Sequence, residues 1–144
     1  MLRQVVASDP GYTGARFALA QLYWETGNIA GAAQTWDEIA RIGFFEELLG
    51  QLKPAFESGG REAMLRVWAE SEYGLSFDKA WALAHLGETE AAIGRLEQAV
   101  EAHEGPVVVV AVDPRFDPLR GDPRFEAFLD RMNYPESARR RRSR

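Results

Sequence analysis

The chain has 144 residues and a mass of 16.1 kDa, which fits one domain with a core large enough to fold by itself. Its composition, 46% hydrophobic and 27% charged, is typical of a globular protein and excludes disorder over most of the length. The lack of cysteine excludes disulfide scaffolds, thiolate zinc sites and cysteine nucleophiles. The longest apolar run, 107–112, is too short to span a bilayer, and the first residues lack a signal-peptide pattern, so we expect a cytoplasmic protein.

Charge is distributed unevenly along the chain. There are 22 acidic and 17 basic residues, but five of the arginines lie within the last six residues, so the rest carries a net charge of about −10. An acidic body repels phosphate groups, and we expect it to bind neither nucleic acid nor a membrane. The arginine-rich stretch 137–144 is expected to be a flexible solvated tail. Contact with an acidic membrane or a nucleic acid, or folding back onto the acidic body, are its alternatives.

Hydrophobic residues recur with helical spacing in the first quarter of the chain. Residues 15–26 and 30–41 each have an apolar face, and Gly27–Asn28 between them predicts a helix end, because both residues tolerate the left-handed conformation. The pattern therefore predicts a helix hairpin. The expected buried face of its first helix consists of Ala15, Ala18, Leu19, Leu22 and Tyr23. That of its second helix consists of Ala32, Ala33, Trp36, Ile39 and Ala40.

The hairpin pattern recurs twice more, with glycine turns at Gly59–Gly60 and at Gly87. Repetition of a helix pair with a glycine turn at a period near 34 residues predicts an all-α solenoid of stacked antiparallel hairpins. The further helices are expected at residues 45–58, 61–73, 76–86 and 88–102.

Two Asp-Pro steps organise the C-terminal third. Aspartate suits the residue before a helix and proline its first turn, so Asp113 and Asp122 predict a short helical turn and then a helix from about residue 123. The valine run before Asp113 has the propensity of a strand, but its place after a helix pair favours a short helix. The short helical turn contains Phe116 and Leu119, and the apolar residues expected to seal the end of the core are Phe125, Phe128, Leu129 and Met132.

The first hairpin resembles the tetratricopeptide repeat (TPR). The residues that carry the resemblance are Asp9-Pro10, Leu19-Ala20, Tyr23, Gly27, Ala32 and Trp36. The fit is good over 13–46. It is weaker in the second repeat, where Lys53 replaces a small residue and Pro54 falls inside a helix, and partial in the third. Residues 112–125 are similar to the end of the TPR tails of bacterial multidomain regulators, where such tails follow winged-helix, Ser/Thr kinase or nucleotide cyclase domains.

The resemblance implies about three TPR-like repeats with a C-terminal capping helix in one domain, 1–136, followed by the tail. Residues 1–12 are interpreted as the last helix of a repeat, so we expect a truncated chain or a fragment of a longer array. The expected divisions are a partial repeat at 1–12, repeats at 13–46, 45–73 and 74–104, and a capping segment at 105–136.

Residue patterns for chemistry are weak throughout. His85 and His103 each lack a helix-spaced metal-binding partner, and no serine lies in a nucleophile-elbow context. Gly59–Gly60 lacks the lysine of a phosphate-binding loop, and paired carboxylates are expected on solvated helix faces. We therefore expect no enzyme, no catalytic residue, no metal site and no cofactor.

The resemblance implies a protein-binding surface instead, because the first helix of each TPR lines a concave face. By position, the residues lining it are Phe17, Gln21, Trp24, Glu25, Glu57, Phe77, Trp81 and His85. Aromatic anchors beside a few polar groups suit the recognition of a peptide or a helix. The alternative, that Phe17, Trp24 and Trp81 are ordinary core residues, has equal weight.

Two functions stay open. The first is a non-enzymatic scaffold that binds a peptide or a partner domain on its concave face. The second is a self-associating regulatory or structural tail of a bacterial signalling or transcriptional regulator whose effector domain is missing from this chain. An apolar N-terminal end with Leu2, Val5 and Val6 favours the second, because it predicts a homodimer formed through that end.

Overall fold

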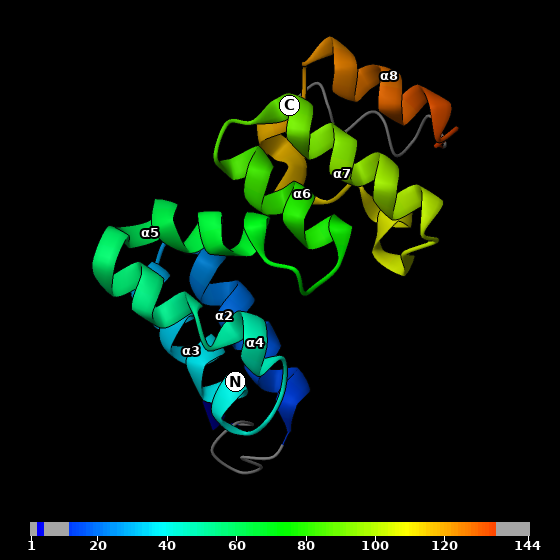
Figure 1. The fold of residues 1–144 in the computed structure, drawn as a ribbon. Coiled ribbons are helices and arrows are strands. Elements are labelled where there is room, and N and C mark those ends of the chain that lie inside the picture. The colour runs from blue at the N-terminus through cyan, green and yellow to red at the C-terminus, as the bar shows by residue number, and fades with distance from the viewer. Residues whose placement is uncertain (1–2, 5–11, 135–144) are drawn as a thin grey trace. The chain divides into compact units, whose positions relative to one another are not determined.

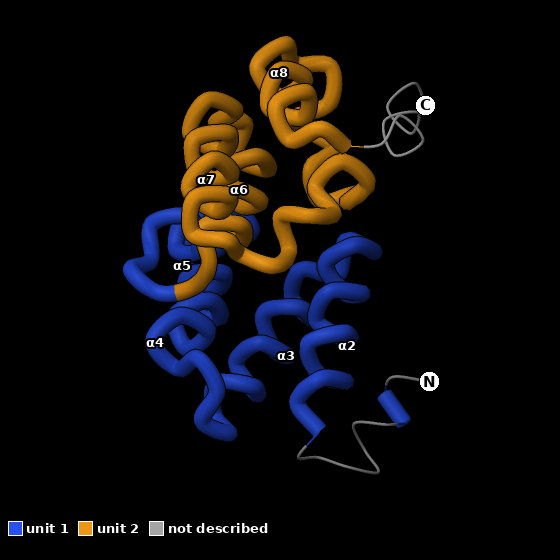
Figure 2. Tube along the Cα trace, turned by 90° about the vertical axis from the view of Figure 1, so that its right-hand side faces the viewer, with its two compact units in different colours: residues 1–73 blue, residues 74–144 orange. Residues whose placement is uncertain are grey.

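The computed structural model describes residues 3–4 and 12–134. Within these ranges the chain forms helices and no strand, which confirms the predicted all-α fold (Figure 1). The expected N-terminal face of Leu2, Val5 and Val6 and the arginine-rich tail lie outside the described residues. The Cα trace divides into two compact units, residues 1–73 and residues 74–144 (Figure 2).

Unit 1 (residues 1–73) contains the predicted first hairpin. Helix α2 spans Thr13–Glu25 and helix α3 spans Ile29–Arg41, and the two pack against each other. Gly27 turns the chain with a φ of 80°. Asn28 starts the second helix, because its side chain accepts a hydrogen bond of 2.9 Å from the backbone N–H of Gly31.

The buried face of α2 differs from the predicted one. Leu22 is 45% exposed and Ala18 is also exposed, so the prediction was wrong at these two positions. Ala20 and Trp24 are buried in their place, beside the correctly predicted Ala15 and Leu19. Apolar residues occur on every side of this helix, and the largest ring determines which side faces inward, because its burial removes the most apolar area from water. The predicted face of α3 is confirmed at all five positions.

In the second predicted helix pair, the first helix is interrupted. Helix α4 covers only Glu46–Leu49, and helix α5 begins again at Leu52 and runs to Glu70. The prediction of an unbroken helix over 45–58 was therefore wrong. Pro54 lies in the first turn of α5, where its missing N–H costs nothing, and not in mid-helix. Gly60 has a φ of 71° and a ψ of −157°, so the expected turn appears as a kink inside α5.

Unit 2 (residues 74–144) begins with the third hairpin. Helix α6 spans Ser76–His85 and helix α7 spans Thr89–Glu101, with Gly87 between them at a φ of 79°. The Glu104 carboxylate, beyond the end of α7, accepts hydrogen bonds of 2.8 and 3.0 Å from the backbone N–H groups of Ser76 and Phe77. It thereby caps the start of α6 and ties together the two open ends of the hairpin.

Two 3₁₀ helices and one α-helix follow in the described part of unit 2, up to residue 134. They are η1 (Gly105–Val109), η2 (Pro114–Leu119) and α8 (Pro123–Arg131). Of the valine run, residues 107–109 lie in η1, in agreement with the predicted short helix, and residues 110–112 form turns. Phe125, Phe128 and Leu129 are at most 2% exposed, as predicted, whereas Met132 is only half-buried. Phe116 and Leu119 of the short helical turn are fully buried as well.

Candidate protein-binding surface

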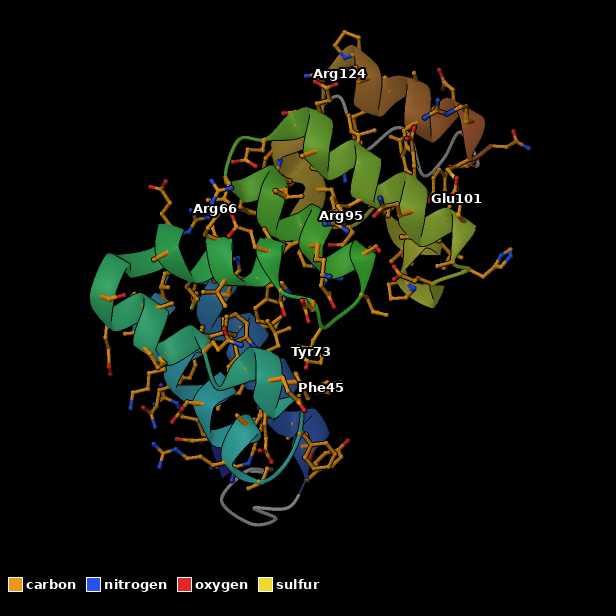
Figure 3. All side chains as sticks on the ribbon, viewed as in Figure 1. Phe45, Arg66, Tyr73, Arg95, Glu101 and Arg124 are labelled. Carbon is orange, nitrogen blue, oxygen red and sulfur yellow. The ribbon has the colours of Figure 1, made fainter. Side chains whose placement is uncertain are left out.

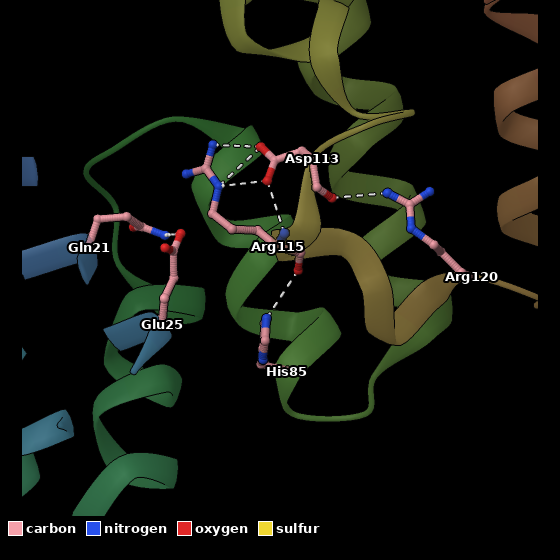
Figure 4. Close-up of polar contacts among 6 residues, drawn as sticks. All are labelled: Gln21, Glu25, His85, Asp113, Arg115 and Arg120. Atoms are coloured by element: carbon pink, nitrogen blue, oxygen red, sulfur yellow. Dashed lines mark hydrogen bonds and ion pairs between the residues drawn. The ribbon is translucent and has the colours of Figure 1, made fainter. Parts of the chain in front are cut away.

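A row of three side chains runs along α2. Phe17, Gln21 and Glu25 are spaced four residues apart, which places them one above the other on one helix face. Gln21 Nε2 donates a hydrogen bond of 2.9 Å to Glu25 Oε1 (Figure 4). Phe17 and Gln21 are half-buried and Glu25 is exposed. The structure thus brings three of the predicted residues together as an aromatic ring, an amide and a carboxylate.

The turn between α3 and α4 extends this surface. We call residues 42–45, Ile-Gly-Phe-Phe, the aromatic turn. Phe45 (labelled in Figure 3) meets the Phe17 ring edge to face with the ring centroids 6.1 Å apart, yet 61% of Phe45 is exposed. Ile42 and Phe44 are 44% and 46% exposed. Sequence reasoning missed this turn, although four residues of this composition between two helices are a signal for exposed apolar surface.

The backbone of Phe45 is held in an unusual conformation. Its φ of 54° and ψ of 39° are left-handed, which is a genuine outlier for a bulky residue. The Phe45 carbonyl accepts hydrogen bonds from the N–H groups of Leu48 and Leu49, at 3.1 and 2.8 Å, and so begins α4. These bonds hold the conformation, and the aromatic ring stays on the outside of the unit.

Trp24 lies within the packing of unit 1. It is 7% exposed, its ring centroid is 6.2 Å from that of Trp36, and the Arg61 guanidinium covers it at 4.8 Å. Trp36 in turn contacts Trp68 at 5.0 Å, so the three indoles form one continuous cluster. Of the two interpretations of Trp24, its position agrees with that of a core residue.

Glu57 lies apart from the α2 row along the chain, on the first half of α5. Its carboxylate is 3.9 Å from the Lys53 ammonium one helical turn earlier, and its side chain is 63% exposed. Lys53 is the residue that departs from the TPR pattern, and in the structure it serves as the partner of Glu57. An exposed pair of this kind contributes at most about 1 kcal/mol to stability, and both groups remain accessible to a ligand.

The three predicted residues on α6 are engaged within unit 2. Phe77 is 1% exposed, with its ring 5.1 Å from Phe116 and under the Arg115 guanidinium at 4.9 Å. Trp81 is 4% exposed and its ring lies 5.8 Å from that of His85. A His85 ring nitrogen lies 3.0 Å from the carbonyl oxygen of Arg115 (Figure 4), so this histidine joins α6 to η2.

One carboxyl group beside this cluster has a displaced pKa. Burial raises the pKa of Asp78 above its ordinary value of 3.8, the positive charge of Arg115 lowers it, and the negative charge of Glu104 raises it further. In the part of the chain that the structure describes, no group of three His, Cys, Asp or Glu side chains is placed to hold a metal ion. The helices described there also include none that is long and apolar enough to cross a bilayer.

Comparison with known families bears on unit 1. Residues 1–53, which include α2, α3 and α4, match the family model of the tetratricopeptide repeat. Unit 1 is TPR-like. Among curated proteins and solved structures, none matches the chain. TPRs are in general scaffolds for protein–protein interaction and not enzymes, so protein binding is the general function that the match supports.

Proposed function

We propose that this protein is a non-enzymatic scaffold that binds a peptide segment of a partner protein on the α2 face of unit 1. The α2 face comprises Phe17, Gln21 and Glu25 together with the ring of Phe45. The observation that carries the proposal is the contact between the Phe17 and Phe45 rings at 6.1 Å, in which Phe45 is still 61% exposed. The TPR match over the same residues supports it.

The chemistry of this face suits an apolar side chain with a polar neighbour. Two rings that meet edge to face bury a ligand side chain at small entropic cost, because each ring has only two rotatable bonds. The contact with Phe17 holds the Phe45 ring before a ligand arrives, which reduces the cost of ordering it. The Gln21–Glu25 pair offers a negative charge about two turns of helix from Phe17, so a basic group in the ligand would be favoured there.

The remaining predicted residues have different parts in the proposal. Glu57 is an accessible carboxylate and remains a candidate for contact with a ligand. Burial of Trp24, Phe77 and Trp81 supports a positioning role, in which these rings hold the helices in place. The contact of His85 with the Arg115 carbonyl supports the same role.

Selection from a displayed peptide library against the full chain tests the proposal. Enriched peptides would then be titrated against the wild type and against Phe17→Ala and Phe45→Ala. We expect each substitution to weaken binding about tenfold, which is the usual cost of removing an aromatic anchor. Leu22→Ala is the matched control, because Leu22 is 45% exposed and lies about 140° around α2 from Phe17.

Two results would contradict this function. One is that no peptide is enriched, and the other is that enriched peptides bind the wild type and the two phenylalanine variants equally. The solution mass, measured by light scattering, separates the alternative: a wild-type dimer would favour the self-associating regulatory tail predicted from Leu2, Val5 and Val6. A monomer that binds peptide through Phe17 and Phe45 would favour the scaffold.

A further inference from the structure

The valine segment, residues 107–112, has a sequence that does not match its conformation. It reads Val-Val-Val-Val-Ala-Val, with no charge, no proline and no glycine. β-branched residues lose side-chain freedom in helices and pack well in sheets. Six uncharged residues of high β-propensity are also the signature of segments that pair with copies of themselves.

In the structure this segment forms 3₁₀ turns. The Val110 N–H donates to the Val107 carbonyl at 3.3 Å, and the Val112 N–H donates to the Val109 carbonyl at 3.0 Å. The Asp113 N–H also donates to the Val109 carbonyl at 2.9 Å. Hydrogen bonds of the 3₁₀ type are poorer than those of an α-helix, so the backbone holds this form less firmly than it would hold an α-helix. The segment therefore prefers a β-strand by its sequence but forms 3₁₀ turns in the structure, so tertiary contacts must stabilise the turns.

Two polar side chains from later in unit 2 supply such contacts. The Arg120 guanidinium donates to the carbonyl of Ala111 at 2.9 Å and to that of Asp113 at 3.0 Å (Figure 4 shows the second of these), and it pairs with the Asp117 carboxylate. The Tyr134 hydroxyl donates to the carbonyl of Val107. A phenol is protonated and able to donate at neutral pH, and burial raises the pKa of Tyr134 further above its ordinary value of 10.0. Both ends of the segment are thus held.

The segment is half inside and half outside the unit. Val107, Val110 and Ala111 are at most 6% exposed, whereas Val108 is 69% exposed and Val109 is 43% exposed. The exposed valines give a second copy of the chain an apolar place of first contact. If the bonds from Arg120 and Tyr134 were lost, the Ala111 carbonyl would lose its side-chain donor, and the Val107 and Asp113 carbonyls would keep only backbone bonds, from the N–H groups of Val110 and Phe116. Opening of these backbone turns would then leave the carbonyl groups able to accept hydrogen bonds from another strand.

We propose that the valine segment is a latent β-strand, which Arg120 and Tyr134 hold in its 3₁₀ form and which, once released, pairs with the same segment of a second copy. The partner is another copy because the segment is uncharged and complementary to itself: in a parallel, in-register pair each valine meets its own counterpart. This self-association is separate from peptide binding on the α2 face and does not depend on it.

Release of the Arg120 contacts is the first test, made in the full chain. Arg120→Met keeps an apolar stem of similar length and removes the donors. We expect the released population to rise about tenfold or more, since the variant loses two hydrogen bonds from a charged donor. Light scattering should then show association, and infrared spectra should show the band of intermolecular β-sheet. Arg124→Met is the matched control, because Arg124 pairs with Asp122 and with Glu90.

A double variant keeps the test decisive if Arg120→Met merely unfolds. Val108→Lys places a charge on the exposed side of the segment, where the folded unit tolerates it and a strand pair does not. We expect Arg120→Met/Val108→Lys to lose the β-sheet band and to associate about tenfold more slowly than Arg120→Met. Association of the double variant at the same rate as Arg120→Met would overturn the proposal, and so would an Arg120→Met protein that remains monomeric and helical.

Hydrogen exchange of the wild type gives an independent measurement. The amides of Val110 and Val112 should exchange before those of α6 and α7, because the segment opens without unfolding the hairpin. Tyr134→Phe should speed their exchange about fivefold or more, since it removes one hydrogen bond. Exchange of these two amides only together with those of α6 and α7 would mean that no separate release occurs, and the proposal would fail.

Discussion

Asp113 and Asp122 each cap the start of a helical segment and pair with a nearby arginine. Each accepts a hydrogen bond from the backbone N–H of the arginine two residues later, at 2.9 and 2.8 Å, and each pairs with the guanidinium of that arginine. The phenylalanine that follows, Phe116 or Phe125, is fully buried. The sequence Asp-Pro-Arg-Phe is therefore a local unit that caps a helix and fixes a core ring, and it occurs twice, nine residues apart.

The two copies differ in burial, and this difference predicts their effect on stability. The Asp113 side chain is 9% exposed and that of Asp122 is 26% exposed. We expect Asp113→Ala to lower the free energy of unfolding by about 2 kcal/mol, because it removes a cap and leaves Arg115 without its carboxylate partner. Asp122→Ala is the comparison and should lose less. Urea unfolding measures both, and equal losses would contradict the argument.

The two carboxyl groups with displaced pKa values respond to pH in opposite directions. Hydrogen bonds from Arg124 lower the pKa of Asp122, so its contribution to stability is present above the ordinary pKa of 3.8 and is lost as the pH falls through the lowered value. Burial raises the pKa of Asp78, so ionisation of this group costs the folded state stability at neutral pH. That cost disappears as the pH falls through the raised pKa towards 3.8.

Asp78→Asn isolates the second effect. Asparagine has the same shape and no charge, so the variant should be more stable than the wild type near neutral pH, and the gain should shrink as the pH falls towards 3.8. Urea unfolding at the two pH values measures this difference. Glu101→Gln neutralises an exposed carboxylate on α7 of the same unit and should show no such trend (Figure 3 labels Glu101). A gain that grows on acidification would have the wrong sign.

The candidate site was predictable only in part, for reasons seen in single residues. The four-residue spacing of Phe17, Gln21 and Glu25 is visible in the sequence, and these three side chains do share one face of α2. Whether Trp24 is inside or outside was not predictable, because the apolar residues of α2 surround the helix and its partners Trp36 and Arg61 come from other segments. Phe45 was missed because only the fold shows its left-handed backbone and its contact with Phe17.

At the level of elements, glycine has different functions in different helices. Gly60 has a φ of 71° and a ψ of −157°, a region that is essentially restricted to glycine, and it joins the two halves of α5. A Cβ atom there would meet nothing within 4 Å, so the backbone alone requires glycine. Gly94 in α7 also has open space around it, but its φ is that of an ordinary residue.

These two glycines form a matched pair for mutagenesis. Gly60→Ala should destabilise the protein by about 1–3 kcal/mol, because alanine is strained in that conformation. Gly94→Ala should stabilise it by about 0.5–1 kcal/mol, because alanine restricts the unfolded chain and favours the helix. Thermal or urea unfolding distinguishes the two signs. If both substitutions stabilised the protein, α5 would be free to straighten and the kink would not be a requirement of the fold.

A helix was predictable from the sequence where glycine or another boundary residue separates it from the next helix. The first and third hairpins were predicted within three residues, since Gly27 and Gly87 stand between clear helical periods. The break between α4 and α5 was missed. Pro54 and Gly50 are its only marks in the sequence, and neither predicts a break without the fold. In the structure, a Cβ atom at Gly50 would lie 2.7 Å from the Glu46 carbonyl oxygen. The valine run was predicted as a helix from its position in the repeat, against its own propensity.

At the scale of the whole molecule, the division into units 1–73 and 74–144 has an energetic consequence. Each unit has its own buried residues: Ile39 in α3 is fully buried in the first, and Ile93 in α7 is 7% exposed in the second. Because the contacts are concentrated inside each unit, we expect each unit to unfold cooperatively by itself, with its own free energy of opening.

A pair of conservative core substitutions tests this independence. Ile39→Val and Ile93→Val each remove one buried methylene, which should lower the local stability by about 0.5–1.5 kcal/mol without unfolding the protein. Hydrogen exchange should show Ile39→Val weakening protection in α2 and α3 and leaving α6 and α7 unchanged, and Ile93→Val doing the reverse. If either substitution weakened protection in both units equally, the chain would unfold as one block. Two separate responses would mean that the valine segment of unit 2 can be released while the α2 face of unit 1 stays folded and able to bind.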